Sequence, residues 1–203
     1  MKKFILGYKD RMTQIFDEDG RVVPVTAINI EENIITQIKN SEKDGYTAIQ
    51  LATGKQKESR ISKALKGHFK KGAYKNVKEF RVEEIGEYKV GDKINLDIFS
   101  AGDKIQAVSV TKGKGFQGGV KRYNMSGGRR SHGNKHAERE VGSIGAGTTP
   151  GRVWKGKKMP GRMGSDRVTI KNLTIVKVDS ENNRILIKGA VAGKPGTLVE
   201  ITA

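Results

Sequence analysis

Gly113, Gly115 and Gly118 have the G-x-G-x-x-G spacing that can hold the phosphates of a dinucleotide. They follow a candidate strand, and Glu138 lies 20 residues after the last of them. A dinucleotide site also requires a helix that begins at the glycines and a second strand that carries the acid. The continuation GVKRYNMSGGRR has no apolar period of about 3.6 residues, so the sequence predicts no helix there. We interpret the glycines as flexible backbone that lies close to a partner.

His132, His136 and Glu140 follow one another at intervals of four residues, which on a helix could bring three ligands to one metal ion. The intervening Gly-Asn-Lys at 133–135 forms helix poorly, and the surrounding cations would repel Zn²⁺. These histidines fit better as donors to phosphate or as rings that stack on bases. Residues 111–167 hold only three acidic side chains and show no Ser-His-Asp arrangement. We therefore expect no enzyme activity, no metal site and no cofactor.

The same stretch holds most of the positive charge. Residues 111–167 carry 14 basic and 3 acidic side chains, which is +11 of the net +17 of the chain. They include 14 of the 26 glycines but only 12 hydrophobic residues, too few to pack a core. A polyanion is therefore expected to order the segment. Its cations and planar side chains are the candidate RNA contacts: Lys112, Lys114, Phe116, Lys121, Arg122, Arg129, Arg130, His132, Lys135, His136, Arg139, Arg152, Trp154, Lys155, Lys157, Lys158, Arg162 and Arg167.

The whole chain has 203 residues, of which 35% are hydrophobic and 6% aromatic, so there is material for a core outside this stretch. No apolar run approaches the roughly 20 residues of a membrane helix. The apolar run near the start ends at Gly7, too early for a secretion signal. The absence of cysteine excludes disulfides and thiolate chemistry. We expect a cytoplasmic protein with a polyanionic partner and no membrane association.

The flanks of the basic stretch read as short strands separated by turn residues. The expected strands are Arg21–Ile30, Asn33–Lys39, Tyr46–Ala52, Glu79–Ile85, Lys93–Phe99, Ile105–Thr111, Val168–Val178, Arg184–Val191 and Thr197–Thr202. Val90-Gly-Asp-Lys-Ile and Ala101-Gly-Asp-Lys-Ile repeat one form, which suits successive hairpin turns in a small barrel. A short basic helix is expected near 59–71, with Ser62 as its cap and Ile61, Leu65 and Phe69 on one face.

These patterns predict a mostly β fold with little helix. Residues 1–111 and 168–203 would form one discontinuous β-barrel domain, and 112–167 would form a long, basic, glycine-rich loop. The sequence shows neither the helix or ribbon of duplex DNA readers nor an amphipathic membrane helix. A folded RNA is the favoured partner. Two alternatives remain open: a chaperone or translation-factor-like barrel that binds RNA and leaves, and a phosphate-cofactor enzyme built on the glycines.

Several long segments of the sequence resemble the bacterial ribosomal protein L-three family. They are MTQIF at 12–16, DGYTAIQLATG at 44–54, TKGKGFQGGVKR at 111–122, SHGNKH at 131–136, GSIGAGTTPGRVWKGKKMPGRMG at 142–164 and the final VDSENNRILIKGAVAGKPG. The resemblance implies a translation-factor-like β-barrel with an RNA-penetrating loop. It also implies a structural constituent of the large ribosomal subunit that binds 23S ribosomal RNA directly, near its 3′ end, and nucleates early assembly.

By this resemblance, Lys112–Arg130 and Arg152–Arg167 would be the two arms of the loop. The tip would approach the peptidyl transferase centre and support translation; its residues would be Ser143, Ile144, Gly145, Ala146, Gly147, Thr148, Thr149 and Pro150. The implied protein partners are the neighbouring large-subunit proteins L-fourteen and L-nineteen. No small-molecule substrate and no homo-oligomer are expected.

The chain departs from the family pattern at three places. Many members carry a methylated glutamine at the tip, and the matching residue here is Thr148, so that modification should be absent. The residues before Gly142 are commonly His-Arg followed by Pro, whereas this chain has Glu138, Arg139, Glu140 and Val141. Two carboxylates beside phosphates are costly unless each pairs with a cation, so the path of the loop should differ here. Tyr8, Asp10 and Arg11 replace the smaller or basic residues usual before MTQIF, so the contacts of the first strand should differ.

Overall fold

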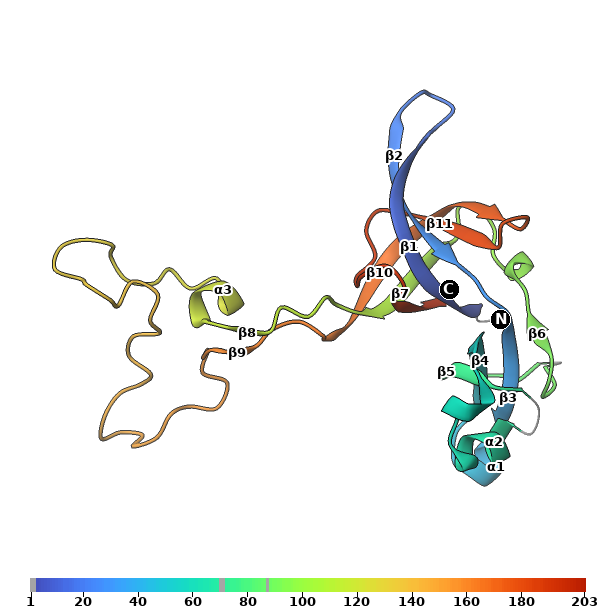
Figure 1. Cartoon of the computed structure of the whole chain (residues 1–203), viewed down its shortest axis with the longest axis horizontal. Coiled ribbons are helices and arrows are strands. Elements are labelled where there is room, and N and C mark those ends of the chain that lie inside the picture. The colour runs from blue at the N-terminus through green and yellow to red at the C-terminus, as the bar shows by residue number, and fades with distance from the viewer. Residues whose placement is uncertain (1–2, 70–71, 87) are drawn as a thin grey trace. The chain divides into compact units, whose positions relative to one another are not determined.

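A closed, antiparallel, six-stranded β-barrel organises the fold (Figure 1). The computed structural model describes residues 3–69, 72–86 and 88–203. The barrel strands follow the order β1 (Phe4–Phe16), β12 (Leu198–Thr202), β7 (Lys104–Val110), β10 (Arg167–Asp179), β11 (Arg184–Lys188) and β2 (Val22–Asn29). Their inward side chains are mostly apolar and fully buried, among them Ile5, Ile28 and Ile175. The predicted mostly β fold with a barrel and little helix is confirmed.

A second antiparallel sheet packs against this core. Its order is β5 (Tyr74–Arg81), β4 (Ala48–Lys55), β3 (Asn33–Lys39) and β6 (Lys93–Ile94). Phe4 of the barrel stacks on Phe80 of this sheet with ring centroids 5.0 Å apart, so one hydrophobic core serves both sheets. On the other face, Ala52 packs with Ile61 and Phe69. Both faces of β4 are therefore covered, which explains its unbroken burial from Ala48 to Gly54.

A buried asparagine joins the barrel to the second sheet. The side chain of Asn33, on β3, accepts a hydrogen bond from Leu6 N–H at 3.0 Å and donates to Leu6 C=O at 2.9 Å. It also donates to Glu31 C=O at 2.8 Å. The amide thus satisfies the backbone groups of Leu6 as a neighbouring strand would, and it is fully buried while doing so.

Seven of the nine expected strands are present, with ends shifted by at most three residues. The strand expected at Glu79–Ile85 was misplaced, because β5 begins at Tyr74 and ends at Arg81, where its pairing with Ala48 of β4 ends. The strand expected at Lys93–Phe99 was wrong beyond Ile94. Leu96–Ile98 form a 3-10 turn, η2, so that Ile94, Leu96 and Phe99 can all point into the core despite their unequal spacing. Strand β1 was missing from the predicted strands.

The helices are short. The helix predicted near 59–71 is α2 (Lys63–Phe69), preceded by the 3-10 turn η1 (Glu58–Arg60); Lys70 and Lys71 lie outside the described residues. Ser62 acts as predicted, since its Oγ accepts a hydrogen bond from Leu65 N–H at 3.4 Å. Leu65, however, is 44% exposed, because Ile61 lies before the helix and helical spacing does not relate the two. Two helices were not expected: α1 (Ser41–Asp44) and α3 (Gly119–Tyr123).

The repeated Gly-Asp-Lys-Ile sequences form the same turn twice. The Asp92 carboxylate accepts from Lys89 N–H at 2.8 Å, and the Asp103 carboxylate accepts from Ser100 N–H at 3.0 Å. Gly91 and Gly102 have φ angles of 101° and 91°, which favour glycine. The turns were expected to close successive hairpins. Instead the first leads into β6, which pairs with β3, and the second into β7, which pairs with β10 and β12.

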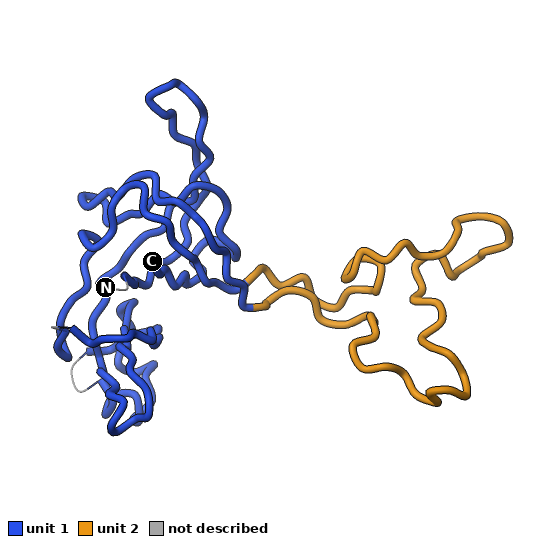
Figure 2. Tube along the Cα trace, turned by 180° about the vertical axis from the view of Figure 1, so that it is seen from behind, with its two compact units in different colours: residues 1–110, 167–203 blue, residues 111–166 orange. Residues whose placement is uncertain are grey.

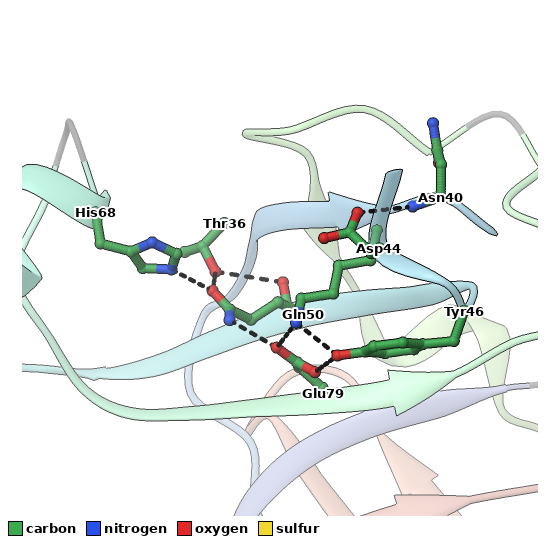
Figure 3. A network of polar contacts seen from close by, with 8 residues as sticks. Thr36, Asn40, Asp44, Tyr46, Gln50, His68 and Glu79 are labelled. Atoms are coloured by element: carbon green, nitrogen blue, oxygen red, sulfur yellow. Dashed lines mark hydrogen bonds and ion pairs between the residues drawn. The ribbon is translucent and has the colours of Figure 1, made fainter. Parts of the chain in front are cut away.

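A polar network covers one face of the second sheet (Figure 3). Gln50 lies at its centre and receives hydrogen bonds on Oε1 from Thr36 at 2.7 Å and from His68 Nε2 at 2.6 Å. The Gln50 amide donates to Glu79 at 3.2 Å, and the Tyr46 hydroxyl donates to the same carboxylate at 3.0 Å. Lys39 completes the network with an ion pair to Glu79 at 3.1 Å.

This network predicts an acid-dependent contribution to stability. Partial burial alone would raise the pKa of Glu79, but hydrogen bonds from Lys39, Tyr46 and Gln50 outweigh it and lower the pKa below 4.5. A pKa that is lower in the folded chain stabilises the fold above about pH 4.5, and this contribution disappears as the pH falls through the folded value. In Glu79→Gln, urea unfolding between roughly pH 3 and 6 should show a flatter pH dependence. A variant as pH-dependent as the parent would contradict this.

Tyr8, which departs from the usual family sequence, contacts the second sheet. Its hydroxyl accepts a hydrogen bond from Asn76 Nδ2 of β5 at 2.7 Å. Burial raises the pKa of Tyr8 against the opposing effect of that hydrogen bond. The first strand therefore has a specific polar contact with the second sheet at this residue.

The described chain forms two compact units, coloured separately in Figure 2. The first unit comprises Met1–Val110 and Arg167–Ala203 and contains the barrel and the second sheet. The second unit is Thr111–Asp166. Since β7 and β10 pair with Val110 opposite Arg167, the second unit begins and ends at two adjacent, paired residues of the barrel.

Candidate nucleic-acid interface

The two ends of the second unit run side by side as a short ladder. Thr111 N–H donates to Asp166 C=O at 2.9 Å, and Lys114 N–H donates to Met163 C=O at 2.9 Å. Strands β8 (Phe116–Gln117) and β9 (Gly161–Arg162) continue the pairing. The structure thus brings the beginning of the first basic arm, 112–117, together with the end of the second, 161–166 (Figure 2).

A small scaffold follows the ladder around α3. Gly119 is buried, and a Cβ there would lie 3.1 Å from Met125 Sδ and 3.3 Å from a Val141 methyl, so only glycine fits without displacement. The Arg122 guanidinium donates to Met159 C=O at 2.9 Å and ties the helix to the returning chain. Gly128 N–H donates to Glu138 C=O at 2.9 Å. This part of the unit has local order that its composition did not predict.

Helix α3 corrects one inference from the glycines. It begins directly after Gly118, where the sequence predicted no helix. It is only five residues long, and the strand inside the motif, β8, has two residues and pairs antiparallel with β9. A dinucleotide site requires a full strand, a longer helix and a parallel neighbouring strand. The motif therefore gives no such site, for a different reason than the one inferred from the sequence.

The cations of the second unit form no ion pair among the described residues. All are exposed except Arg122, which is half-buried. The six ion pairs of the described chain all lie in the first unit. The thirteen unpaired cations are Lys112, Lys114, Lys121, Arg122, Arg129, Arg130, Lys135, Arg139, Arg152, Lys155, Lys157, Lys158 and Arg162. Their charge is therefore available to an external polyanion.

Arg167 differs from these thirteen. It is the first residue of β10 in the first unit, and its guanidinium pairs with Glu200 at 2.6 Å. Glu200 also forms an ion pair with Lys78 at 3.2 Å. A phosphate would have to compete with this carboxylate for Arg167, so its contribution to binding should be smaller than that of an unpaired cation.

The planar side chains of the second unit are accessible. Phe116 is 75% exposed and Trp154 is 59% exposed, so neither packs in a core. Cations lie over two of the rings: the Arg152 guanidinium is 4.9 Å from the Trp154 centroid, and Arg122 is 4.9 Å from that of Tyr123. Such pairs hold a flat ring and a positive charge at one place, where an RNA presents a base and its phosphate.

The expected tip is exposed and uncharged. Residues Ser143 to Thr149 are all exposed, and Pro150 is half-buried. The Ser143 hydroxyl donates to Gly145 C=O at 3.0 Å, and Gly151 N–H donates to Gly147 C=O at 3.2 Å, so short local turns shape the segment. The run from 141 to 151 contains no charged residue, in contrast to the chain on either side.

His132, His136, Glu138 and Glu140 are also exposed. His132 has a φ of 59°, so helical geometry does not relate it to His136. Within residues 3–69, 72–86 and 88–203, no three metal-binding side chains come together. Neither Glu138 nor Glu140 forms an ion pair with a described residue.

The described chain also contains no helix with the length and hydropathy needed to cross a bilayer.

Comparison with known proteins gives matches along nearly the whole chain. The family model of ribosomal protein L3 matches residues 69–190. The large ribosomal subunit protein uL3 of Ectopseudomonas mendocina is 51% identical over 195 residues, 95% of this chain and 93% of that protein. The protein of the same name from Syntrophus aciditrophicus is 51% identical over 95% of this chain and 89% of its own length. The one from Corynebacterium jeikeium is 48% identical over 98% and 93%.

Together, the barrel, the cationic second unit and these matches define a ribosomal protein, a structural class without enzymatic activity. Within that class, the chain belongs to the ribosomal protein L3 family. The resemblance of the sequence motifs to this family is thus confirmed.

Proposed function

We propose that the protein is a cytoplasmic, structural constituent of the large ribosomal subunit that binds 23S ribosomal RNA directly through its second unit. The observation that carries this proposal is the set of thirteen cations without ion pairs, all of them exposed except Arg122. Each such cation can replace a condensed counterion on a phosphate, which favours binding and makes it sensitive to salt. The relatives named above are large-subunit proteins, which supports the same assignment.

The second unit further supports a role for its tip near the peptidyl transferase centre. Two basic arms flank the uncharged run from 141 to 151, which consists mostly of small residues. Small, uncharged residues let RNA close around the backbone, while the arms neutralise the phosphates that this brings together. The tip would support the catalytic RNA by packing, without a chemical step of its own. An early role in assembly, close to the 3′ end of the RNA, fits a segment that RNA must surround.

The protein neighbours in this proposal are the large-subunit proteins L-fourteen and L-nineteen. No small-molecule substrate, membrane contact or homo-oligomer belongs to the proposal. Sedimentation of salt-washed ribosomes is the direct test. An integral constituent stays with the large subunit after the wash, and a density map of that particle should show residues 111–166 surrounded by RNA. A chain that is released into the supernatant would contradict the proposal and favour an RNA chaperone that binds and leaves.

Replacing Arg129 and Arg130 by alanine should reduce the salt dependence of RNA binding. Both side chains are exposed and unpaired, so each is expected to contact one phosphate. Plotted as log affinity against log salt concentration, the slope should fall by roughly one to two units. Titration of a large-subunit RNA fragment at several salt concentrations gives this slope.

Lys43→Ala/Lys194→Ala is the matched control, because it removes the same charge from exposed residues of the first unit. Its slope should equal that of the parent. If Arg129→Ala/Arg130→Ala also keeps the parental slope, these two residues do not contact phosphate.

A further inference from the structure

The outer part of the β1–β2 hairpin extends beyond the other barrel strands (Figure 1). We use the name outer hairpin for Met12–Pro24. On β1, Phe4–Tyr8 pair with β12, but Met12–Phe16 pair only with β2. On β2, the pairing with β11 starts at Val25, so Val22 and Val23 pair only with β1. A two-stranded ribbon by itself is marginally stable in water, so a covering partner would stabilise this one.

One face of the outer hairpin is apolar and exposed. Phe16 lies opposite Val22, and Met12 lies four residues before Phe16 on the same face. Phe16 is 68% exposed, Val22 is 55% exposed and Met12 is 49% exposed. Pro24, paired with Gln14, lies between them on this face and is exposed as well. Neighbouring large apolar side chains left in water mark an interaction surface more often than single ones do.

The charge of the outer hairpin is opposite to that of the chain. It contains three carboxylates and one arginine, a net charge of −2 in a protein of +17. Asp17 shapes the turn, since its side chain accepts from Glu18 N–H at 3.0 Å and its backbone pairs with Arg21. Glu18 and Asp19 are exposed and form no ion pair with a described residue. Their carboxylates would repel phosphates, so RNA is a poor occupant for this surface.

We propose that the outer hairpin docks a basic segment of a neighbouring protein. Apolar side chains of that segment would pack on Met12, Phe16 and Val22, and its Lys or Arg side chains would face Glu18 and Asp19. The inference rests on the proposed function, because a protein neighbour within an RNA particle is itself selected for positive charge. A second copy of the same hairpin would bring carboxylates against carboxylates and is disfavoured.

Photo-crosslinking in intact large subunits tests this proposal. The chain carrying Phe16→p-benzoylphenylalanine is assembled into subunits, which are salt-washed, irradiated, treated with ribonuclease and analysed by mass spectrometry. The exposure of Phe16 allows this substitution without disturbing the core. We expect an adduct to a single other protein, at a peptide that contains both apolar and basic residues. Reversing the charge with Glu18→Lys/Asp19→Lys should lower the adduct yield roughly tenfold.

The control Glu83→Lys/Glu84→Lys makes the same charge change at exposed residues elsewhere in the first unit and should leave the yield unchanged. An adduct to RNA, an adduct to a second copy of the chain, no adduct, or a yield that ignores the charge reversal would each overturn the inference. The proposed function is judged separately by recovery of the chain in the washed subunits. Recovery without the expected adduct rejects only the docking surface, whereas loss from the subunits rejects both.

Discussion

Replacing residues 112–165 with an Asn-Gly turn is expected to yield a folded barrel that has lost about 10³-fold in affinity for large-subunit RNA. The barrel should survive because Val110 and Arg167 are paired neighbours, and Thr111 and Asp166 are already joined by a backbone hydrogen bond of 2.9 Å. A two-residue turn can close such a pair. The affinity should fall because the deletion removes all thirteen unpaired cations while leaving the six ion pairs of the first unit in place.

Circular dichroism and urea unfolding report on the barrel of this variant, and a binding titration reports on its affinity. The matched control keeps residues 112–165 but changes the thirteen cations to serine. If charge dominates, the control should bind as weakly as the deletion and with a similarly small salt slope. If it keeps most of the parental affinity, shape and stacking would outweigh charge. A deletion variant that binds RNA as tightly as the parent would show that the RNA interface lies in the first unit.

Asn33→Ala is expected to lower the free energy of unfolding by roughly 2–4 kcal/mol. The change removes three hydrogen bonds at once and leaves Leu6 N–H, Leu6 C=O and Glu31 C=O without their partner. Each buried backbone group left unsatisfied costs about 1–3 kcal/mol, partly offset where water can enter. Urea unfolding at neutral pH gives the difference. A loss below about 1 kcal/mol would show that this link does not stabilise the fold.

Two further variants at and away from this link sharpen the measurement. Asn182→Ala removes an exposed asparagine that bonds only to Asp179 at the surface, and it should change stability by less than about 0.5 kcal/mol. Asn33→Asp keeps an acceptor for Leu6 N–H but sets a carboxylate against the two carbonyls. Its deficit relative to the parent should shrink as the pH falls and the new carboxyl becomes protonated, because the protonated form can donate.

The barrel strands were predictable where one face is buried and the other is not. Arg184–Lys188 alternates in burial throughout and Leu198–Thr202 alternates up to Ile201, so their periodicity was visible in the sequence. Strand β1 was missed because its pattern changes along its length. Phe4, Ile5 and Leu6 are buried in succession, and a register shift between Lys9 and Met12 then interrupts the alternation. The strand conformation of such a segment depends on its pairing with two different strands, and no local sequence pattern indicates that pairing.

The basic segment shows a different balance. Its cations and planar side chains were evident from residue type alone, whereas residue type left open whether Phe116 and Trp154 pack against the barrel or stay accessible. The scaffold around α3 was not evident, because it depends on a few specific contacts between residues that are not neighbours in sequence, such as Arg122 with Met159 and Gly128 with Glu138. The asparagine link at Asn33 was equally invisible, since a polar residue at the start of a strand usually faces solvent.

The attachment of the second unit to adjacent residues of paired strands has an evolutionary consequence. The strands β7 and β10 hold their register through several pairs before Val110 and Arg167, whatever the chain does between them. Insertions or deletions at this junction change only the entropy of closing a loop, which grows slowly with length. Relatives could therefore lengthen, shorten or recode this segment to follow changes in their RNA while the hydrophobic core stays under separate selection.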